Sequence, residues 1–192
     1  MAGVAGPMLR YDRAGAVRFL VGLLFGGLAG SALLAVPVHL LGRLVEVLVA
    51  EEARWLIFGV LVVGFGIADL TLRTPYLHRQ VPVSLIRMLK PGRLGVVWGL
   101  DLAMLFTTQK TTSMLWVTLA GLVLVAPGAA PIVLPAAWAV AALAMAVLAV
   151  RSPTLSSIGE EGLAWEDLVK ILRRSSGAIL LGAAAVGAFL MT

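Results

Sequence analysis

The sequence has no cysteine and little charge. None of its 192 residues is cysteine, and only 13% are Asp, Glu, Lys or Arg. The missing thiols exclude a disulfide scaffold, a thiolate metal site and thiol redox chemistry. The two histidines, His39 and His78, lie far apart in the sequence. A histidine-based metal site is therefore not expected, and we expect neither a metal nor a cofactor.

What the sequence has instead is apolar residues. Hydrophobic residues make up 60% of the chain, and the mean hydropathy is +1.01. Soluble domains contain about 45–50% apolar and about 25% charged residues, so this composition indicates exposure to lipid. The net charge of +5 comes from basic residues that flank apolar segments. We interpret these residues as topology signals, with the lipid bilayer and not nucleic acid as the partner.

The apolar residues fall into five segments, and a membrane-spanning helix needs about 20 residues. The segments are 16–42, 55–72, 94–127, 131–150 and 175–191. The third segment is long enough to be either one interrupted span or two short spans that meet at Lys110.

Charge placement favours the single interrupted span. Most basic residues lie in 10–18, 73–93 and 151–174. Five spans with the N-terminus inside and the C-terminus outside place all three regions on the cytoplasmic side. We therefore predict an all-α polytopic integral membrane protein with a single transmembrane domain and about five helices, two of them long and interrupted. The expected location is a bacterial plasma (inner) membrane.

Two charged segments have apolar residues at near-helical spacing. They are "SLIRMLK" at 84–90, which Pro91 stops, and "EEGLAWEDLVKILRR" at 160–174. We expect both to be interfacial helices, the second lying along the membrane before the chain turns into the last span. Docking of a partner protein is the alternative role.

Small residues and one proline mark the first span. Gly22, Gly26 and Gly30 form a double G-x-x-x-G pattern, which predicts close helix packing within the fold or, alternatively, self-association into a homo-oligomer. Pro37 removes a backbone hydrogen bond inside this span, so an interruption or kink is expected there. His39 follows closely, and we weigh a structural hydrogen bond against a role in a solute pathway.

A hydroxyl-rich group stands at the centre of the third segment. "FTTQKTTS" places four threonines and Ser113 around Lys110; the threonines are Thr107, Thr108, Thr111 and Thr112. Hydroxyls can bond to free carbonyls, and β-branched residues weaken a helix locally. A broken helix at membrane depth is tolerated where it is buried in protein or lines a watery cavity. We predict a functional break at 107–113.

Charges inside apolar spans are rare, and this chain has three. They are Asp69, Asp101 and Lys110. A lysine at the bilayer centre costs about 2.5–3.5 kcal/mol on insertion scales, so it needs a partner or a function. The functional interpretation is a charged pathway for a solute or ion through these three residues. A structural charge pair, or a lysine that snorkels to the interface, is the alternative.

The two long segments resemble a known family. "GGLAGSALLAVPVHLLG" at 26–42 and "WGLDLAMLFTTQKTTSMLW" at 98–116 each have an irregular centre, and "RMLKPGRLG" precedes the second. This pattern resembles the transmembrane thiol-disulfide transducers of the CcdA and DsbD type, in the LysE-like superfamily. The resemblance implies broken helices in two inverted repeats. Both of the family's cysteines are absent, so its electron transfer is not implied.

Two functions are therefore expected, and neither is enzymatic, because the sequence contains no recognisable catalytic motif. The first is a small transporter- or channel-like protein with its pathway at the broken helices. The second is a non-catalytic membrane subunit, an anchor or assembly partner for a larger complex, bound to membrane or peripheral protein subunits.

Overall fold

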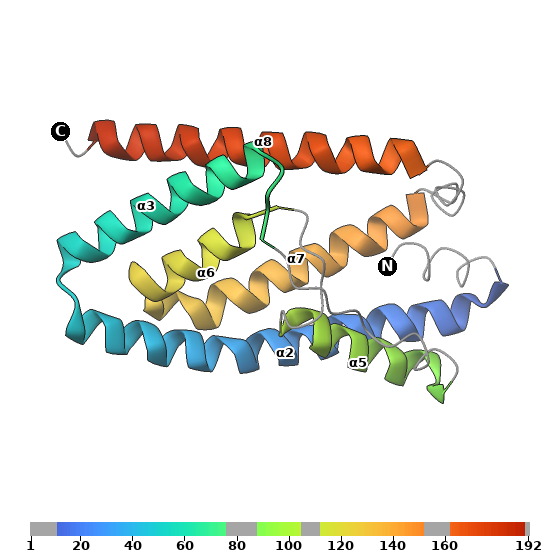
Figure 1. Cartoon of the computed structure of the whole chain (residues 1–192). Helices are drawn as coiled ribbons and strands as arrows, with labels where there is room; N and C mark the ends of the chain where they lie inside the picture. Colours follow the sequence, from blue (N-terminus) through green and yellow to red (C-terminus); the bar gives the residue numbers. More distant parts are fainter. Residues whose placement is uncertain (1–10, 76–87, 105–111, 152–161, 191–192) are drawn as a thin grey trace. The chain divides into compact units, whose positions relative to one another are not determined.

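A computed structural model of the chain describes residues 11–75, 88–104, 112–151 and 162–190, and every regular element in these ranges is a helix (Figure 1). The helices are α2 (Arg13–Leu48), α3 (Glu51–Leu70), α5 (Pro91–Ala103), α6 (Met114–Leu124), the 3-10 helix η1 (Pro127–Ala129), α7 (Ala130–Arg151) and α8 (Gly162–Leu190). The all-helical class predicted from the sequence is confirmed for these residues.

Three helical stretches of the described residues are long and apolar enough to cross a membrane. They are Arg13–Leu48, Glu51–Leu70 and Pro127–Val147. Their large apolar side chains are widely exposed, as at Leu56 (70%) and Ile132 (74%). Such exposure is unfavourable in water and natural in hydrocarbon. The number of spans and their orientation stay predictions.

The first span is not interrupted at Pro37, so the expected interruption at this residue is wrong. Helix α2 continues through Pro37 and has 36 residues in all. At 1.5 Å per residue it is about 54 Å long. One proline removes a single hydrogen bond, and the bonds of the neighbouring turns hold the helix together. The helix is also longer than the roughly 30 Å hydrocarbon core that it would cross.

The third apolar segment consists of two separate helices in the described residues. Helix α5 begins at Pro91, whose fixed φ suits a first helical position, and ends at Ala103. Helix α6 begins at Met114. The expected break at 107–113 falls between them, although residues 105–111 lie outside the described part of the chain.

Helix α8 differs from the expectation for the end of the chain. Residues 160–174 were predicted to lie along the interface before the chain turns into a last span. The structure has one continuous helix, Gly162–Leu190, instead. The predicted turn lies at 174–175, where the helix continues without a break, and the next two residues, Ser176 and Gly177, are buried. The other predicted interfacial helix, 84–90, lies mostly outside the described residues.

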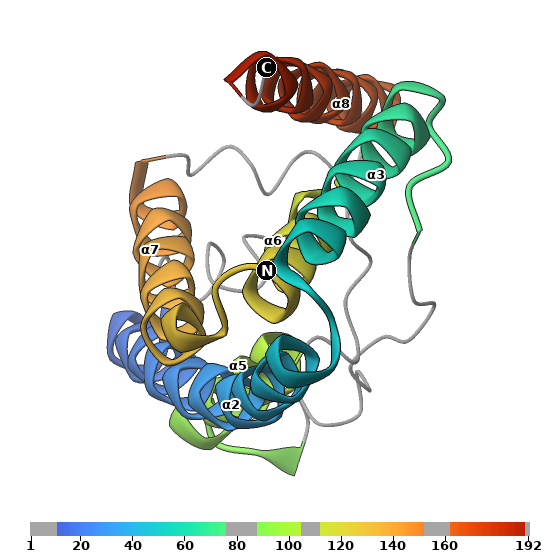
Figure 2. The ribbon, with the colours of Figure 1, turned by 90° about the vertical axis from the view of Figure 1, so that its left-hand side faces the viewer.

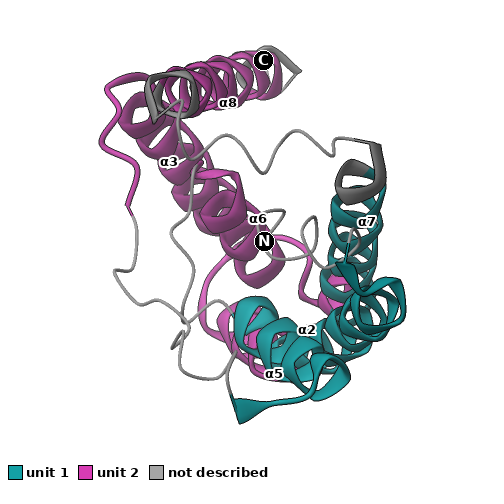
Figure 3. Cartoon of the chain, turned by 90° about the vertical axis from the view of Figure 1, so that its right-hand side faces the viewer, with its two compact units in different colours: residues 1–35, 78–108, 131–162 teal, residues 36–77, 109–130, 163–192 magenta. Residues whose placement is uncertain are grey.

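The helices group into two compact units, which Figure 3 shows in different colours. Unit 1 contains α2 as far as Ala35, together with α5 and α7. Its α5 lies along α2 in Figure 2. A Cβ at Gly22 or Gly26 would overlap the α5 backbone at Gly92 and Val96. The small residues therefore let the two helix backbones approach closely.

Glycines on α5 complete this contact from the other side. A Cβ at Gly95 would overlap the backbone of Phe19, and one at Gly99 would overlap that of Leu23. Phe19 packs edge-on against Trp98 with ring centroids 6.0 Å apart, a favourable aromatic geometry. Phe19, Leu23, Leu94 and Trp98 form the buried core of unit 1.

Unit 2 contains the rest of α2 from Val36, together with α3, α6, η1 and α8. Figures 1 and 2 show the C-terminal end of α3 against α8. The contact is made by two glycines, because a Cβ at Gly177 would lie 2.7 Å from the carbonyl oxygen of Gly66. This close approach brings α8 to the buried Asp69 at the end of α3.

Candidate functional site

The candidate site lies in unit 2, where helix α3 ends in a tight turn. The Leu72 N–H donates to the Asp69 carbonyl at 3.1 Å, and the Arg73 N–H donates to the Ala68 carbonyl at 2.8 Å. These two bonds form a Schellman motif, whose reversing residue is usually glycine. Here that residue is Leu72, with φ of 60°. The turn redirects the chain so that Thr74 lies beside Asp69.

The carboxylate of Asp69 is the centre of the site and is fully buried, with 0% exposure. Three hydroxyl groups donate to it: Thr74 Oγ1 at 2.7 Å, Ser113 Oγ at 2.6 Å and Ser176 Oγ at 2.7 Å. The Ser113 backbone N–H also donates, at 2.9 Å to Oδ2 and 3.1 Å to Oδ1. One side chain therefore joins α3, the start of α6 and α8.

The negative charge of Asp69 is stabilised by neutral hydrogen-bond donors, namely hydroxyl groups and a backbone N–H. Within the described ranges it forms no ion pair, since the salt bridges there join other residues. Ser113 is the N-cap of α6, so the carboxylate also faces the positive end of that helix dipole. A buried carboxylate with several short hydrogen bonds is well solvated without water.

Arg173 holds α8 to the turn after α3. Its Nη1 donates to the Leu72 carbonyl oxygen at 3.3 Å. Arg173 precedes Ser176 by three residues, which is about one helical turn. The same helix face thus stabilises the unusual backbone of Leu72 and supplies a hydroxyl to Asp69.

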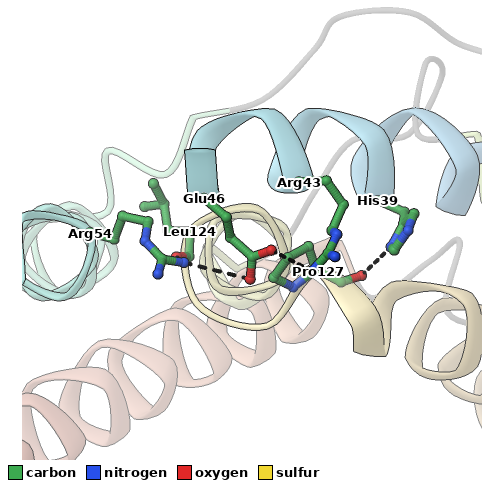
Figure 4. Close-up of polar contacts among 6 residues, drawn as sticks. All are labelled: His39, Arg43, Glu46, Arg54, Leu124 and Pro127. Atoms are coloured by element: carbon green, nitrogen blue, oxygen red, sulfur yellow. Dashed lines mark hydrogen bonds and ion pairs between the residues drawn. The ribbon is translucent and has the colours of Figure 1, made fainter. Parts of the chain in front are cut away.

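A second polar group in unit 2 holds the turn between α6 and η1 (Figure 4). His39 Nδ1 donates to the Pro127 carbonyl at 2.9 Å, and Arg54 Nη1 donates to the Leu124 carbonyl at 3.1 Å. Glu46 forms an ion pair with Arg43, with Oε2 2.7 Å from Nη1 of the arginine. Its other carboxylate oxygen lies 3.7 Å from Nη1 of Arg54. A cation at the last turn of α6 complements the helix dipole. These contacts fasten a loop.

The structure places the predicted pathway residues in different regions. Asp69, Pro37, His39 and Thr112 belong to unit 2, and Asp101 belongs to unit 1. Asp101 has an interaction partner of its own. The remaining predicted residues, Thr107, Thr108, Lys110 and Thr111, lie outside the described residues. Of the predicted pathway residues that the structure describes, Asp69 lies in the hydroxyl-rich site, with Thr112 directly before its partner Ser113, and His39 lies in the second polar group.

Most of the partners of Asp69 were not predicted from the sequence. Thr74 and Ser176 were not singled out, although each is a hydroxyl residue next to or within an apolar helix. The sequence offered one signal for Ser176, which lies between Ser175 and Gly177 in α8. Small and hydroxyl residues together indicate a place where membrane helices pack closely. Likewise Gly95 and Gly99 repeat the four-residue spacing of the α2 glycines.

Among the described residues no three His, Asp or Glu side chains gather in a group that could hold a metal ion. The site instead offers one carboxylate and three hydroxyls, which suit proton or hydrogen-bond chemistry. Comparisons with protein families, with curated proteins and with solved structures found no match to this chain.

Proposed function

We propose that this chain is a small transporter- or channel-like protein that moves a small solute or ion across a bacterial inner membrane. The proposed architecture is a multi-pass protein with about five spans, the N-terminus inside and the C-terminus outside. Asp69 and Ser113 would form part of the pathway, to which the sequence also assigns Asp101 and Lys110.

The burial of Asp69 in an apolar helix carries this proposal. Its helix, Glu51–Leu70, is apolar enough to span a membrane, yet the carboxylate is fully buried at one end. Ionisable residues in spans are costly, and those that persist mark ion paths, proton relays or substrate sites. The hydroxyls from α8 and from the start of α6 give this charge a polar surrounding where helices are discontinuous.

Flux measurements on the full chain test the proposal. The protein is purified in mild detergent and reconstituted into vesicles of phosphatidylethanolamine and phosphatidylglycerol. Gradients of H⁺, Na⁺, K⁺ and chloride are then imposed. We expect flux of at least one probe above that of protein-free vesicles, and its loss in Asp69→Asn, Asp101→Asn and Lys110→Ala.

A matched control keeps this test specific. Asp167 is an exposed acid on α8, whose side chain is 68% accessible, so Asp167→Asn should leave flux unchanged. Wild-type protein that is folded but gives no flux with any probe contradicts the proposal. Variants that are lost from the membrane instead of losing flux indicate a structural role for the substituted residue.

The alternative function is a non-catalytic membrane subunit. It is favoured by open glycines on α8, because a Cβ at Gly182 or Gly187 would meet nothing within 4 Å. Glycines at helix contacts, such as Gly177 of the same helix, are crowded by their partner. Affinity purification from native membranes tests this alternative. Stoichiometric partner proteins that Gly182→Leu releases would support it, and a lone chain would contradict it.

A further inference from the structure

Helices α2 and α5 of unit 1 run parallel, and both begin at the same end of their contact (Figure 1). A Cβ at Gly22 of α2 would overlap the backbone of Gly92 on α5. A Cβ at Gly30, eight residues farther along α2, would overlap the backbone of Leu100, eight residues farther along α5. The first turns of the two helices therefore lie beside each other.

Four cations gather at this common end. They come from the first two turns of α2 and from the start of α5, and all are exposed: Arg13, Arg18, Lys90 and Arg93. Arg18 lies against the first turn of α5, because a Cβ at Gly92 would be 3.7 Å from the Cβ of Arg18. Lys90 is the N-cap of α5. We call these four residues the basic patch.

The charge of the basic patch is not neutralised by the described residues. The salt bridges among those residues all join other side chains. Asp12, the acid next to Arg13, accepts a 2.8 Å hydrogen bond from the Gly15 N–H and so caps α2. With Asp12 included, the patch still has a net charge of +3. The positive ends of two helix dipoles add to the repulsion among its cations.

A cation near the other end of α2 is neutralised within the chain. Arg43 forms a 2.7 Å ion pair with Glu46. Arg54 lies 3.7 Å from the same carboxylate group. The basic patch lacks such an acid in the part of the chain that the structure describes, so an anion from outside the chain would relieve its repulsion.

The surface next to the basic patch is apolar. Val21 lies about one turn beyond Arg18 on α2, Val97 lies about one turn beyond Arg93 on α5, and both valines are exposed. Tyr11, just before α2, is also exposed, and tyrosine is enriched at the headgroup level of membranes. A free phosphate ion would fit the cations alone. A lipid, with a phosphate and acyl chains, fits both the cations and the valines.

From these observations we infer that the basic patch binds the phosphate headgroups of anionic membrane lipids, whose acyl chains lie along the exposed valines of α2 and α5. Basic clusters at the membrane surface attract such lipids. This lipid binding goes beyond the proposed transport and does not depend on it.

Lipid selection by the full chain in detergent tests the inference. The purified protein is incubated in mixed micelles with equal amounts of phosphatidylglycerol and phosphatidylcholine and is re-isolated by affinity chromatography. Mass spectrometry then quantifies the bound lipids. We expect phosphatidylglycerol to be enriched over phosphatidylcholine. Arg18→Gln and Arg93→Gln should each lower this enrichment roughly fivefold, because each cation contributes separately to the attraction.

Matched variants separate charge from other effects of substitution. The double variant Arg18→Lys and Arg93→Lys keeps both charges and should keep the enrichment. Arg43→Gln removes an exposed cation that is paired with Glu46, so it should leave the enrichment unchanged. Circular dichroism of each variant checks its fold.

Two measurements on the wild-type protein need no variant. An increase in NaCl from 0.1 to 1 M shortens the Debye length from about 10 to about 3 Å, so the enrichment should fall. Excess inorganic phosphate, added at constant ionic strength, should not displace the lipid. These measurements decide the matter even if a glutamine variant does not fold.

Several results would overturn the inference. One is a wild-type protein without enrichment, or with enrichment that salt does not change. Another is equal enrichment in the wild type and in the folded glutamine variants. Displacement by inorganic phosphate would make the patch a site for a free anion instead. A protein that selects phosphatidylglycerol but moves no probe would refute the proposed function and still support lipid binding.

Discussion

Ser176 donates a 2.7 Å hydrogen bond to the carboxylate of Asp69, although the two residues are 107 positions apart in the sequence. This bond joins the end of α3 to the middle of α8, next to the close contact of Gly66 and Gly177. A hydrogen bond to a buried charged group contributes about 1.5–3 kcal/mol. The predictions below follow from this and related contacts.

Ser176→Ala should lower the free energy of unfolding by about 1.5–3 kcal/mol, because one of the donors to a buried carboxylate is lost. Unfolding in mixed detergent micelles, followed by circular dichroism, measures the effect. The neighbouring Ser175 is exposed, so Ser175→Ala should change stability by less than about 0.5 kcal/mol. If the two substitutions change the free energy of unfolding equally, the hydrogen bond between Ser176 and Asp69 does not contribute to stability.

Asp69→Asn should also destabilise the fold, by about 1–3 kcal/mol, because the amide turns a donor toward the donors that surround it. The same unfolding assay applies, with the exposed Asp167→Asn as the control. We further expect the double variant with Ser176→Ala to lose less than the sum of the two single losses, since both changes disrupt one network. Simple additivity would contradict a shared network.

Gly26→Ala should be disruptive, because its Cβ would overlap the Val96 backbone of α5. Overpacking of this kind costs about 1–3 kcal/mol, and backbone cannot move aside as a side chain can. The control is Gly64→Ala in α3, whose Cβ would meet nothing within 4 Å. That substitution should raise stability by up to about 1 kcal/mol through helix propensity. The two apparent melting temperatures should therefore shift in opposite directions.

Leu72→Gly should stabilise the end of α3. A residue other than glycine in the left-handed region costs roughly 1–2 kcal/mol, and Leu72 has φ of 60°. Glycine removes this strain and suits the reversing position of the motif. Arg73→Gly, at the next position, should bring no such gain. Thermal unfolding of both variants in detergent decides the matter, and a loss of stability in Leu72→Gly would show that its side-chain packing outweighs the strain.

Composition and hydropathy alone predicted a helical protein with spans long and apolar enough for a membrane. Lipid exposure requires apolar surface and internally satisfied backbone, and both requirements are local properties of the sequence. The glycine spacing in α2 indicated close packing for the same reason, because small residues four apart must share one helix face. The run of threonines after Asp101 predicted a break in the third apolar segment, and α5 ends before this run while α6 begins after it.

Only the tertiary structure decided which of these features act together. Asp69 was recognised as a rare charge, but its partners Thr74, Ser113 and Ser176 come from separate elements, and helical periodicity does not say which helices meet. The continuity of α2 through Pro37 and of α8 through Ser176 likewise depends on packing that outweighs local preference. The sequence therefore determined the helices and their apolar character, which suits a membrane, whereas long-range contacts determined where the buried charge of Asp69 finds its hydrogen-bond partners.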